Sequence, residues 1–189
     1  MKKFLTVFFA TMLLSGVIAT AQTRSWSVNA GYLSSALSVS AGALSASLDL
    51  NGFFVGVACD LPTSSAESTI QIGANWDIKS ASLGDESATV HYLRVPVFTK
   101  YTHPVNDGMA LFFGAGPSFN FGIYGGDDAF ASEDGGLYRF HLQLGAAVGM
   151  VFSDKFIVKI GYDYGLTKAM RADVSNRINA LQIGVGLKF

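Results

Sequence analysis

The chain has 189 residues, 50% of them hydrophobic and only 14% charged, and its formal net charge is −1 at pH 7. This length corresponds to one domain, and no Pro-rich or charged linker divides it. The near-neutral charge argues against a nucleic-acid partner, and so few charges are unusual for a soluble protein, in which about 25% of residues are charged.

Residues 1–21 have the pattern of a cleaved secretory signal peptide. Two lysines precede an apolar stretch over residues 4–18, and small residues follow at Ala19 and Ala21. The pattern predicts cleavage between Ala21 and Gln22. The alternative interpretation, a membrane-spanning helix, would need about 20 apolar residues, and this stretch is shorter.

After the signal peptide, apolar residues alternate with small or polar residues in eight segments. Each has the two-residue period of a β-strand with one apolar and one polar face. The segments are residues 26–32, 53–60, 70–78, 92–101, 109–122, 139–150, 156–164 and 181–189. A membrane protein without spanning helices must be a closed barrel, because lipid cannot satisfy unpaired backbone groups. We therefore predict an all-β fold, in which residues 22–189 form an eight-stranded antiparallel transmembrane β-barrel.

The connections between the segments are alternately short and long. Short ones are expected at residues 61–65, 102–108 and 152–155, and longer ones around residues 41, 83, 128 and 171. This alternation is typical of barrels with short periplasmic turns and long extracellular loops. In the connection around residue 41, leucines and valines still alternate with serines. That stretch has two interpretations, a hairpin that continues beyond the membrane and a disordered loop.

The last segment has apolar residues at every second position and ends in an aromatic residue. We expect the barrel-assembly machinery to recognise it, and its apolar face to contact outer-membrane lipid. These residues are Leu181, Ile183, Val185, Leu187 and Phe189. The main alternative fold is a soluble barrel of lipocalin type, whose apolar face points inward. Alternation alone does not distinguish the two arrangements.

The polar faces of the segments predict a charged interior. A barrel of about eight strands has an interior just wide enough for side chains to fill, which argues against a porin. Buried charges persist only when they are paired, so we expect a polar network in the lumen. Its predicted members are Asp60, Asp77, Arg94, Lys100, Arg139, Gln143, Lys159, Asp163 and Lys188.

Three short motifs resemble a known family. Residues 91–101 read HYLRVPVFTKY and resemble the YLEIPLLLKY strand of PorT-like outer-membrane β-barrel proteins of Bacteroidetes. Residues 114–117 (GAGP) and 184–189 (GVGLKF) resemble later strands of that family. The resemblance implies an eight-stranded barrel in the outer membrane of a Gram-negative cell. Arg94 stands where the family usually has an acidic residue, so a lumenal pair built on that acid is not carried over.

Few residues of the sequence suggest catalysis or metal binding. His91 and His141 are both predicted near the outer rim, where Ser87, Glu86 or Asp85 would complete a nucleophile–base arrangement. No motif holds these residues together, and an acidic, glycine-rich stretch over residues 125–136 lacks the regular spacing of a calcium loop. We expect no catalytic, metal or cofactor site.

The sequence therefore predicts a non-enzymatic integral outer-membrane protein. Its expected role is structural, or a surface interaction through the extracellular loops. One alternative is an accessory component of an envelope secretion or assembly system with a protein partner, since the namesake of the PorT-like family takes part in secretion. A second alternative is an enzyme that modifies outer-membrane lipid.

Overall fold

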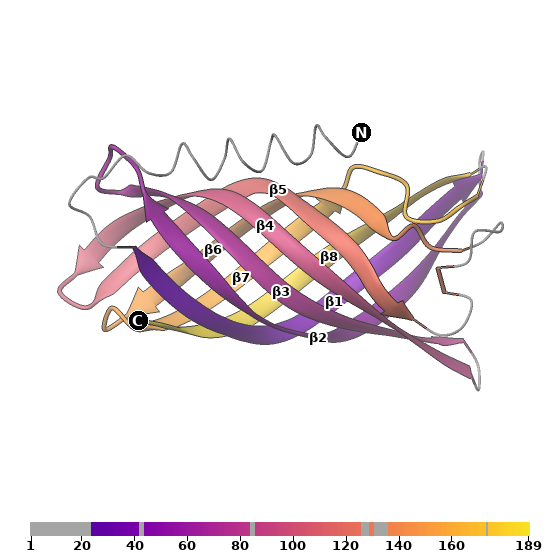
Figure 1. Cartoon of the computed structure of the whole chain (residues 1–189), viewed down its shortest axis with the longest axis horizontal. Coiled ribbons are helices and arrows are strands. Elements are labelled where there is room, and N and C mark those ends of the chain that lie inside the picture. The colour runs from indigo at the N-terminus through magenta and orange to yellow at the C-terminus, as the bar shows by residue number, and fades with distance from the viewer. Residues whose placement is uncertain (1–23, 42–43, 84–85, 126–128, 131–135, 173) are drawn as a thin grey trace.

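The computed structural model describes residues 24–41, 44–83, 86–125, 129–130, 136–172 and 174–189, which form a closed antiparallel barrel (Figure 1). Each strand pairs with its neighbour in the sequence, and β1 pairs with β8 to close the barrel. The strands are β1 (Ser25–Ala41), β2 (Leu44–Pro62), β3 (Ser68–Leu83), β4 (Glu86–Asn106), β5 (Met109–Gly125), β6 (Phe140–Phe152), β7 (Phe156–Gly165) and β8 (Ser175–Lys188). The predicted eight-stranded all-β fold is confirmed.

Among the described residues there is no helix long and apolar enough to cross a membrane.

The two ends of the described chain meet at the end of the barrel that carries the short turns. The backbone N–H of Trp26 donates to the Phe189 carbonyl over 3.0 Å, and the N–H of Phe189 donates back over 2.8 Å. In the β6–β7 turn, Ser153 and Asp154 have φ angles of 50° and 57°. Two consecutive residues with positive φ are typical of a type I′ hairpin turn, which fits the twist of paired strands. All three connections at this end are short, whereas the opposite end carries the two longest connections, and this difference identifies the end with the chain termini as periplasmic.

Large apolar side chains cover the outside of the barrel, and polar side chains fill its middle. On β2, Phe53 and Val55 are 66% and 60% exposed, whereas the inward Phe54 is 3% exposed. Inward polar residues such as Asp77 and Gln143 are fully buried. This arrangement excludes a lipocalin-type barrel for the membrane-spanning part and places its apolar face against lipid.

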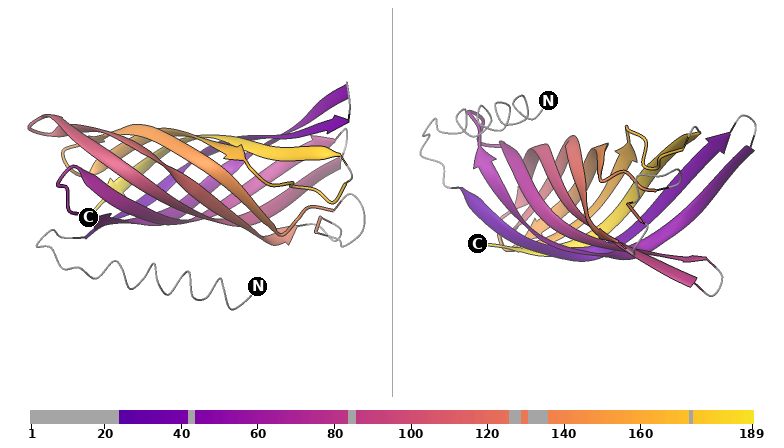
Figure 2. Two further views of the ribbon diagram at one scale, coloured as in Figure 1. Left: turned by 90° about the horizontal axis from the view of Figure 1, so that it is seen from above. Right: turned by 45° about the vertical axis from the view of Figure 1, so that its right-hand side comes forward.

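Two hairpins extend farther than the others at the extracellular end. The β1–β2 and β3–β4 hairpins reach past the remaining strands (Figure 2), and β1 and β2 have 17 and 19 residues. A transmembrane strand needs only about 9–11 residues. The long loop expected around residue 83 is instead a paired hairpin, and in both extensions the strand pairing continues to within two residues of the hairpin end. The hairpin interpretation of the stretch around residue 41 is confirmed.

The outward apolar residues of the membrane-spanning part form a band that we call the apolar belt. The two faces of β1 exchange their polarity where the strand leaves this belt. Within the belt, Tyr32 points outward and Asn29 inward; beyond it, Ser34 lies on the outer face and Leu37 on the inner face. The alternation never loses phase, so the strand continues straight into the extension.

The inward apolar residues of the extensions form a core that we call the cap core. The two longer connections contribute to it from inside the barrel, and Leu137 and Met170 join them through an isolated β-bridge. The cap core consists of Leu37, Leu50, Ala81, Val90, Tyr92, Ala169 and Ile178, with Val39, Leu48, Ala129, Phe130, Leu137 and Met170 packed against it. The cap core thus covers the extracellular end of the charged lumen.

Candidate functional site: the charged lumen

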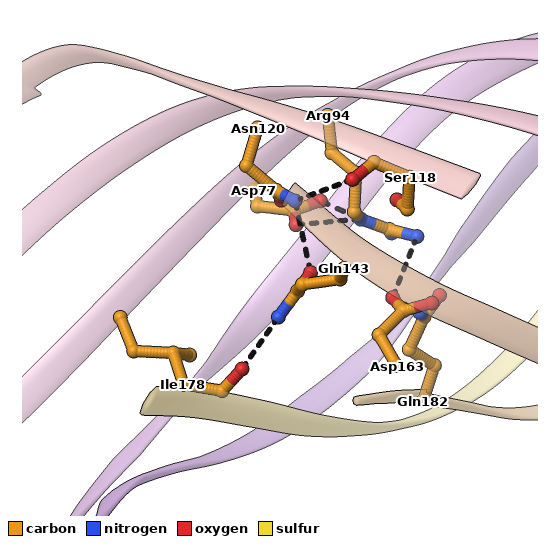
Figure 3. A network of polar contacts seen from close by, with 8 residues as sticks. All are labelled: Asp77, Arg94, Ser118, Asn120, Gln143, Asp163, Ile178 and Gln182. Carbon is orange, nitrogen blue, oxygen red and sulfur yellow. Dashed lines mark hydrogen bonds and ion pairs between the residues drawn. The ribbon is translucent and has the colours of Figure 1, made fainter. Parts of the chain in front are cut away.

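Arg94 on β4 lies at the centre of the charged lumen. Its Nε and Nη2 donate to the two carboxylate oxygens of Asp77 on β3 over 2.8 and 3.2 Å (Figure 3). Its Nη1 lies 3.5 Å from Oδ2 of Asp163 on β7, across the barrel. All three side chains are almost completely buried. Bidentate pairing of a guanidinium with a carboxylate is among the stronger polar contacts in proteins, so this triad ties together strands that are not neighbours.

Amide side chains extend the network to three more strands. Gln182 on β8 donates to Asp163, and Nδ2 of Asn120 on β5 donates to Oε1 of Gln143 on β6 over 2.9 Å (Figure 3). Nε2 of Gln143 then donates to the carbonyl of Ile178 on β8 over 2.8 Å. Gln143 acts as both acceptor and donor, which allows its single side chain to link β5 to β8.

A second charged group lies nearer the periplasmic end. Lys100 on β4 forms an ion pair with Asp60 on β2, and Nε2 of Gln71 on β3 donates to the other oxygen of Asp60 over 2.7 Å. Lys100 and Asp60 also line a vestibule of about 360 Å³, together with Glu67 and Lys188. This pair therefore forms the inner wall of the periplasmic opening.

Aromatic rings fill the space between these charges. Gly31 and Gly184 pair across β1 and β8, and a Cβ on Gly31 would lie 2.6 Å from Cε1 of Phe54. Inward glycines thus make room for the Phe54 ring. The Arg94 guanidinium and the Lys159 ammonium lie 5.4 and 5.6 Å from the centre of that ring. Cation–π contacts of this kind stabilise charges that have lost their water.

The space left in the middle of the lumen is a cavity of about 30 Å³, which we call the small cavity. This is roughly the volume of one water molecule in the liquid. Its polar lining consists of Gln71, Asn75, Arg94, Lys100, Lys159 and Gln182. The lumen is therefore packed rather than open.

Most residues predicted for the lumen point inward. The structure brings Asp60 together with Lys100, and Arg94 together with Asp77 and Asp163, while Gln143, Lys159 and Lys188 contribute from β6, β7 and β8. Arg139 was expected in the lumen, and that expectation was wrong. It is exposed, with its guanidinium 5.0 Å from the centre of the Phe130 ring. The reason is that Arg139 precedes the first residue of β6 and lies at the extracellular rim, where its carbonyl accepts a hydrogen bond from the N–H of Gly122.

Sequence reasoning missed several inward polar residues, among them Lys79, Asn120 and Gln182. Lys79 is 1% exposed and lies with its ammonium 5.3 Å from the ring of Tyr92, whereas Asn120 and Gln182 belong to the hydrogen-bonded network. The predicted strand over residues 70–78 ended one residue before Lys79. The signal that would have found it is the continued alternation through Lys79 and Ala81 into the extension.

Of the two signals predicted at the chain ends, the structure describes the C-terminal one and not the signal-peptide cleavage site. Ala21 and Gln22 lie outside the described residues. The side chains of the last strand point outward and are exposed on the lipid-facing surface. They are Leu181, Ile183, Val185, Leu187 and Phe189.

The histidines considered for catalysis lie on opposite sides of the barrel wall. His91 points outward, and its Nδ1 accepts a hydrogen bond from Nε1 of Trp76 over 3.0 Å. His141 points inward and is 2% exposed. Its ring makes an edge-to-face contact with the ring of Tyr92, with 5.0 Å between the two ring centres. A backbone wall separates the two rings, so they cannot act on one substrate or hold one metal ion. Within the described part of the chain, no cluster of three His, Cys, Asp or Glu residues could hold a metal ion.

Comparisons with known proteins agree with the fold. The family model described as outer membrane protein beta-barrel domain matches residues 20–171. No curated protein matches the chain.

Several solved barrels are similar in structure. Neisserial surface protein A (NspA) is 16% identical, with a TM-score of 0.52, over 89% of this chain and 100% of that one. The outer membrane enzyme PagL is 14% identical, with a TM-score of 0.52, over 82% and 97%. Ail, the attachment invasion locus protein of Yersinia pestis, is 13% identical, with a TM-score of 0.49, over 89% and 100%. At these identities the likeness to NspA and PagL shows the shared barrel fold alone.

Proposed function

The chain belongs to the outer membrane protein beta-barrel domain family and is an outer-membrane protein, and from this premise we propose that it is a non-enzymatic surface-interaction protein. Its barrel anchors the two hairpin extensions, which present a rigid contact surface outside the cell. The PorT-like resemblance remains part of this proposal, as a narrower placement within the family.

The cap core is the observation that carries the proposal. A hairpin that only connects two membrane strands needs no hydrophobic core of its own, and isolated two-stranded hairpins are at best marginally stable in water. Here β1–β2 and β3–β4 bury apolar residues beyond the apolar belt and leave residues such as Ser47 and Asp49 exposed on the outside. Burial of this kind holds the extensions in one shape, as binding to a partner requires.

Two other roles receive less support. The packed lumen is unsuited to diffusion, and the separation of His91 from His141 removes the arrangement on which a lipid-modifying activity would rest. One observation favours the accessory secretion or assembly role. The periplasmic vestibule carries both signs of charge, on Asp60, Glu67, Lys100 and Lys188, and would suit contact with an envelope protein.

We also propose that the outward residues of β8 act as the recognition signal for the barrel-assembly machinery. Their exposure along one face leaves them available to a partner strand during insertion.

Photo-crosslinking in cells tests the surface role. A photoreactive phenylalanine would be placed at Ser47 on the extension, at Val55 on the lipid-facing belt, or at Asp107 in the β4–β5 turn. All three positions are exposed. We expect one adduct of defined mass at Ser47, and lipid adducts only at Val55, which serves as the matched control on the same outward face of β2.

The position of the adduct distinguishes the two interaction roles. A protein adduct at Asp107 and none at Ser47 would replace the surface role with the periplasmic accessory role. The absence of a specific adduct at both positions would contradict both and leave a purely structural function.

A further inference from the structure

The membrane-spanning lumen has more positive than negative side chains. Among the described inward residues, Lys79, Arg94, Lys100 and Lys159 face three carboxylates, Asp60, Asp77 and Asp163. Arg94 contacts two of the carboxylates and Lys100 the third. Among the described residues, neither Lys79 nor Lys159 has a carboxylate within 4.0 Å. Lys79 lies over the ring of Tyr92 and Lys159 over the ring of Phe54. A lysine in this environment requires a counter-charge to remain protonated.

The small cavity lies beside Lys159, and its charged lining is of one sign. Arg94, Lys100 and Lys159 line it, and none of the three carboxylates does. The other polar lining residues are amides. Gln71 and Gln182 each donate one N–H to a carboxylate, so each retains a second N–H, and Asn75 adds its own amide.

We propose that the small cavity binds a single small monovalent anion, chloride, with Lys159 as its principal ligand. The volume of about 30 Å³ is sufficient for one ion of this size. A water molecule would also fit, but it would leave the excess positive charge in place. One chloride makes the numbers of positive and negative charges in the lumen equal.

The anion reaches the site from the periplasmic side. Lys100 lines both the small cavity and the periplasmic vestibule, and Lys188 lines the vestibule farther out. The vestibule also contains Asp60 and Glu67, whereas Lys100 and Lys159 give the small cavity at its inner side a positively charged lining. At the other end, the cap core closes the lumen with apolar side chains.

Urea unfolding of the purified protein in lipid vesicles tests the site. Midpoints would be compared in sodium chloride and in sodium gluconate at the same ionic strength. A ligand that binds only the folded state raises stability as its concentration rises. We expect a higher midpoint in chloride, with a shift that saturates, and the same shift in bromide.

The test variant is Lys159→Gln and the matched control is Lys155→Gln, which removes the same charge from the exposed β6–β7 turn. We expect the chloride shift to disappear in K159Q and to persist in K155Q. Equal midpoints in the two salts for the unmodified protein, or the same response in both variants, would overturn the proposal.

Crystals of the unmodified protein grown in bromide give a second measurement that does not depend on the folding of K159Q. The expected result is an anomalous-scattering peak in the small cavity, within hydrogen-bond distance of Lys159 Nζ. A cavity without such a peak would overturn the site.

Discussion

Arg94 determines how the carboxylates of the lumen are arranged. It forms ion pairs with Asp77 and Asp163 from two different strands, and Gln182 donates a hydrogen bond to Asp163 from a third. Removal of one member of a buried ion pair is costly because the remaining charge stays buried without a partner. Here two carboxylates would lose their partner at once.

We predict that Arg94→Met destabilises the barrel by about 3–5 kcal/mol, the range for breaking a buried pair. Urea unfolding in lipid vesicles measures this change. Arg177→Met is the matched control, because Arg177 is exposed on the outer face of β8 and bonds only to the hydroxyl of Tyr164. Equal stability of R94M and R177M would contradict the role of the triad. In R94M combined with Asp77→Asn and Asp163→Asn, we expect part of the loss to be recovered.

The inward phase of most charged residues was predictable, but their partners were not. Arg94, Asp77 and Asp163 each alternate with apolar residues in their own segment. Asp77 lies on the strand next to Arg94, while Asp163 reaches it across the lumen from β7. A local period says which way a side chain points, and the tilt and closure of the barrel decide which side chains meet.

The exchange of polarity along β1 and β2 explains why strand ends were harder to predict than strand centres. The outward residues of β2 change from Val55 and Phe53 to Asn51, Asp49 and Ser47 as the strand leaves the apolar belt. A search for strands with an apolar outer face stops at this boundary. The same alternation with exchanged polarity continues for several more residue pairs.

Two arginine substitutions on the outward face of β2 test this boundary. We predict that Val55→Arg destabilises the barrel by about 2–4 kcal/mol, the cost of a cationic side chain near the middle of a bilayer. Ser47→Arg lies on the same face of the same strand but in water, and we expect a change within about 0.5 kcal/mol. The measurement is the free energy of unfolding in lipid vesicles. Similar losses for both variants would place Ser47 within the membrane and contradict the extension.

The whole molecule is a barrel filled at three levels. The cap core occupies the extracellular level, the Arg94 triad and aromatic rings occupy the middle, and the Asp60–Lys100 pair lies above the periplasmic vestibule. Each level joins side chains from strands that are not neighbours in the wall. A path for solutes would require all three levels to open together.

We therefore predict that the protein forms no stable open channel. In planar lipid bilayers, the reconstituted protein should give no stepwise conductance in 1 M salt under an applied voltage of about 100 mV. A porin inserted in the same bilayer is the positive control. Reproducible conductance steps from the unmodified protein would show that the filled lumen opens.

Some features of this protein followed from the sequence by itself, namely the number of strands, the division of most strand residues between two faces and the outer-membrane location. They did so because the two-residue period is a local property of each strand. Only the tertiary structure decided where each strand and hairpin leaves the membrane and which charges pair across the lumen. Those outcomes depend on barrel closure, since side chains far apart in the chain become neighbours only when β1 pairs with β8.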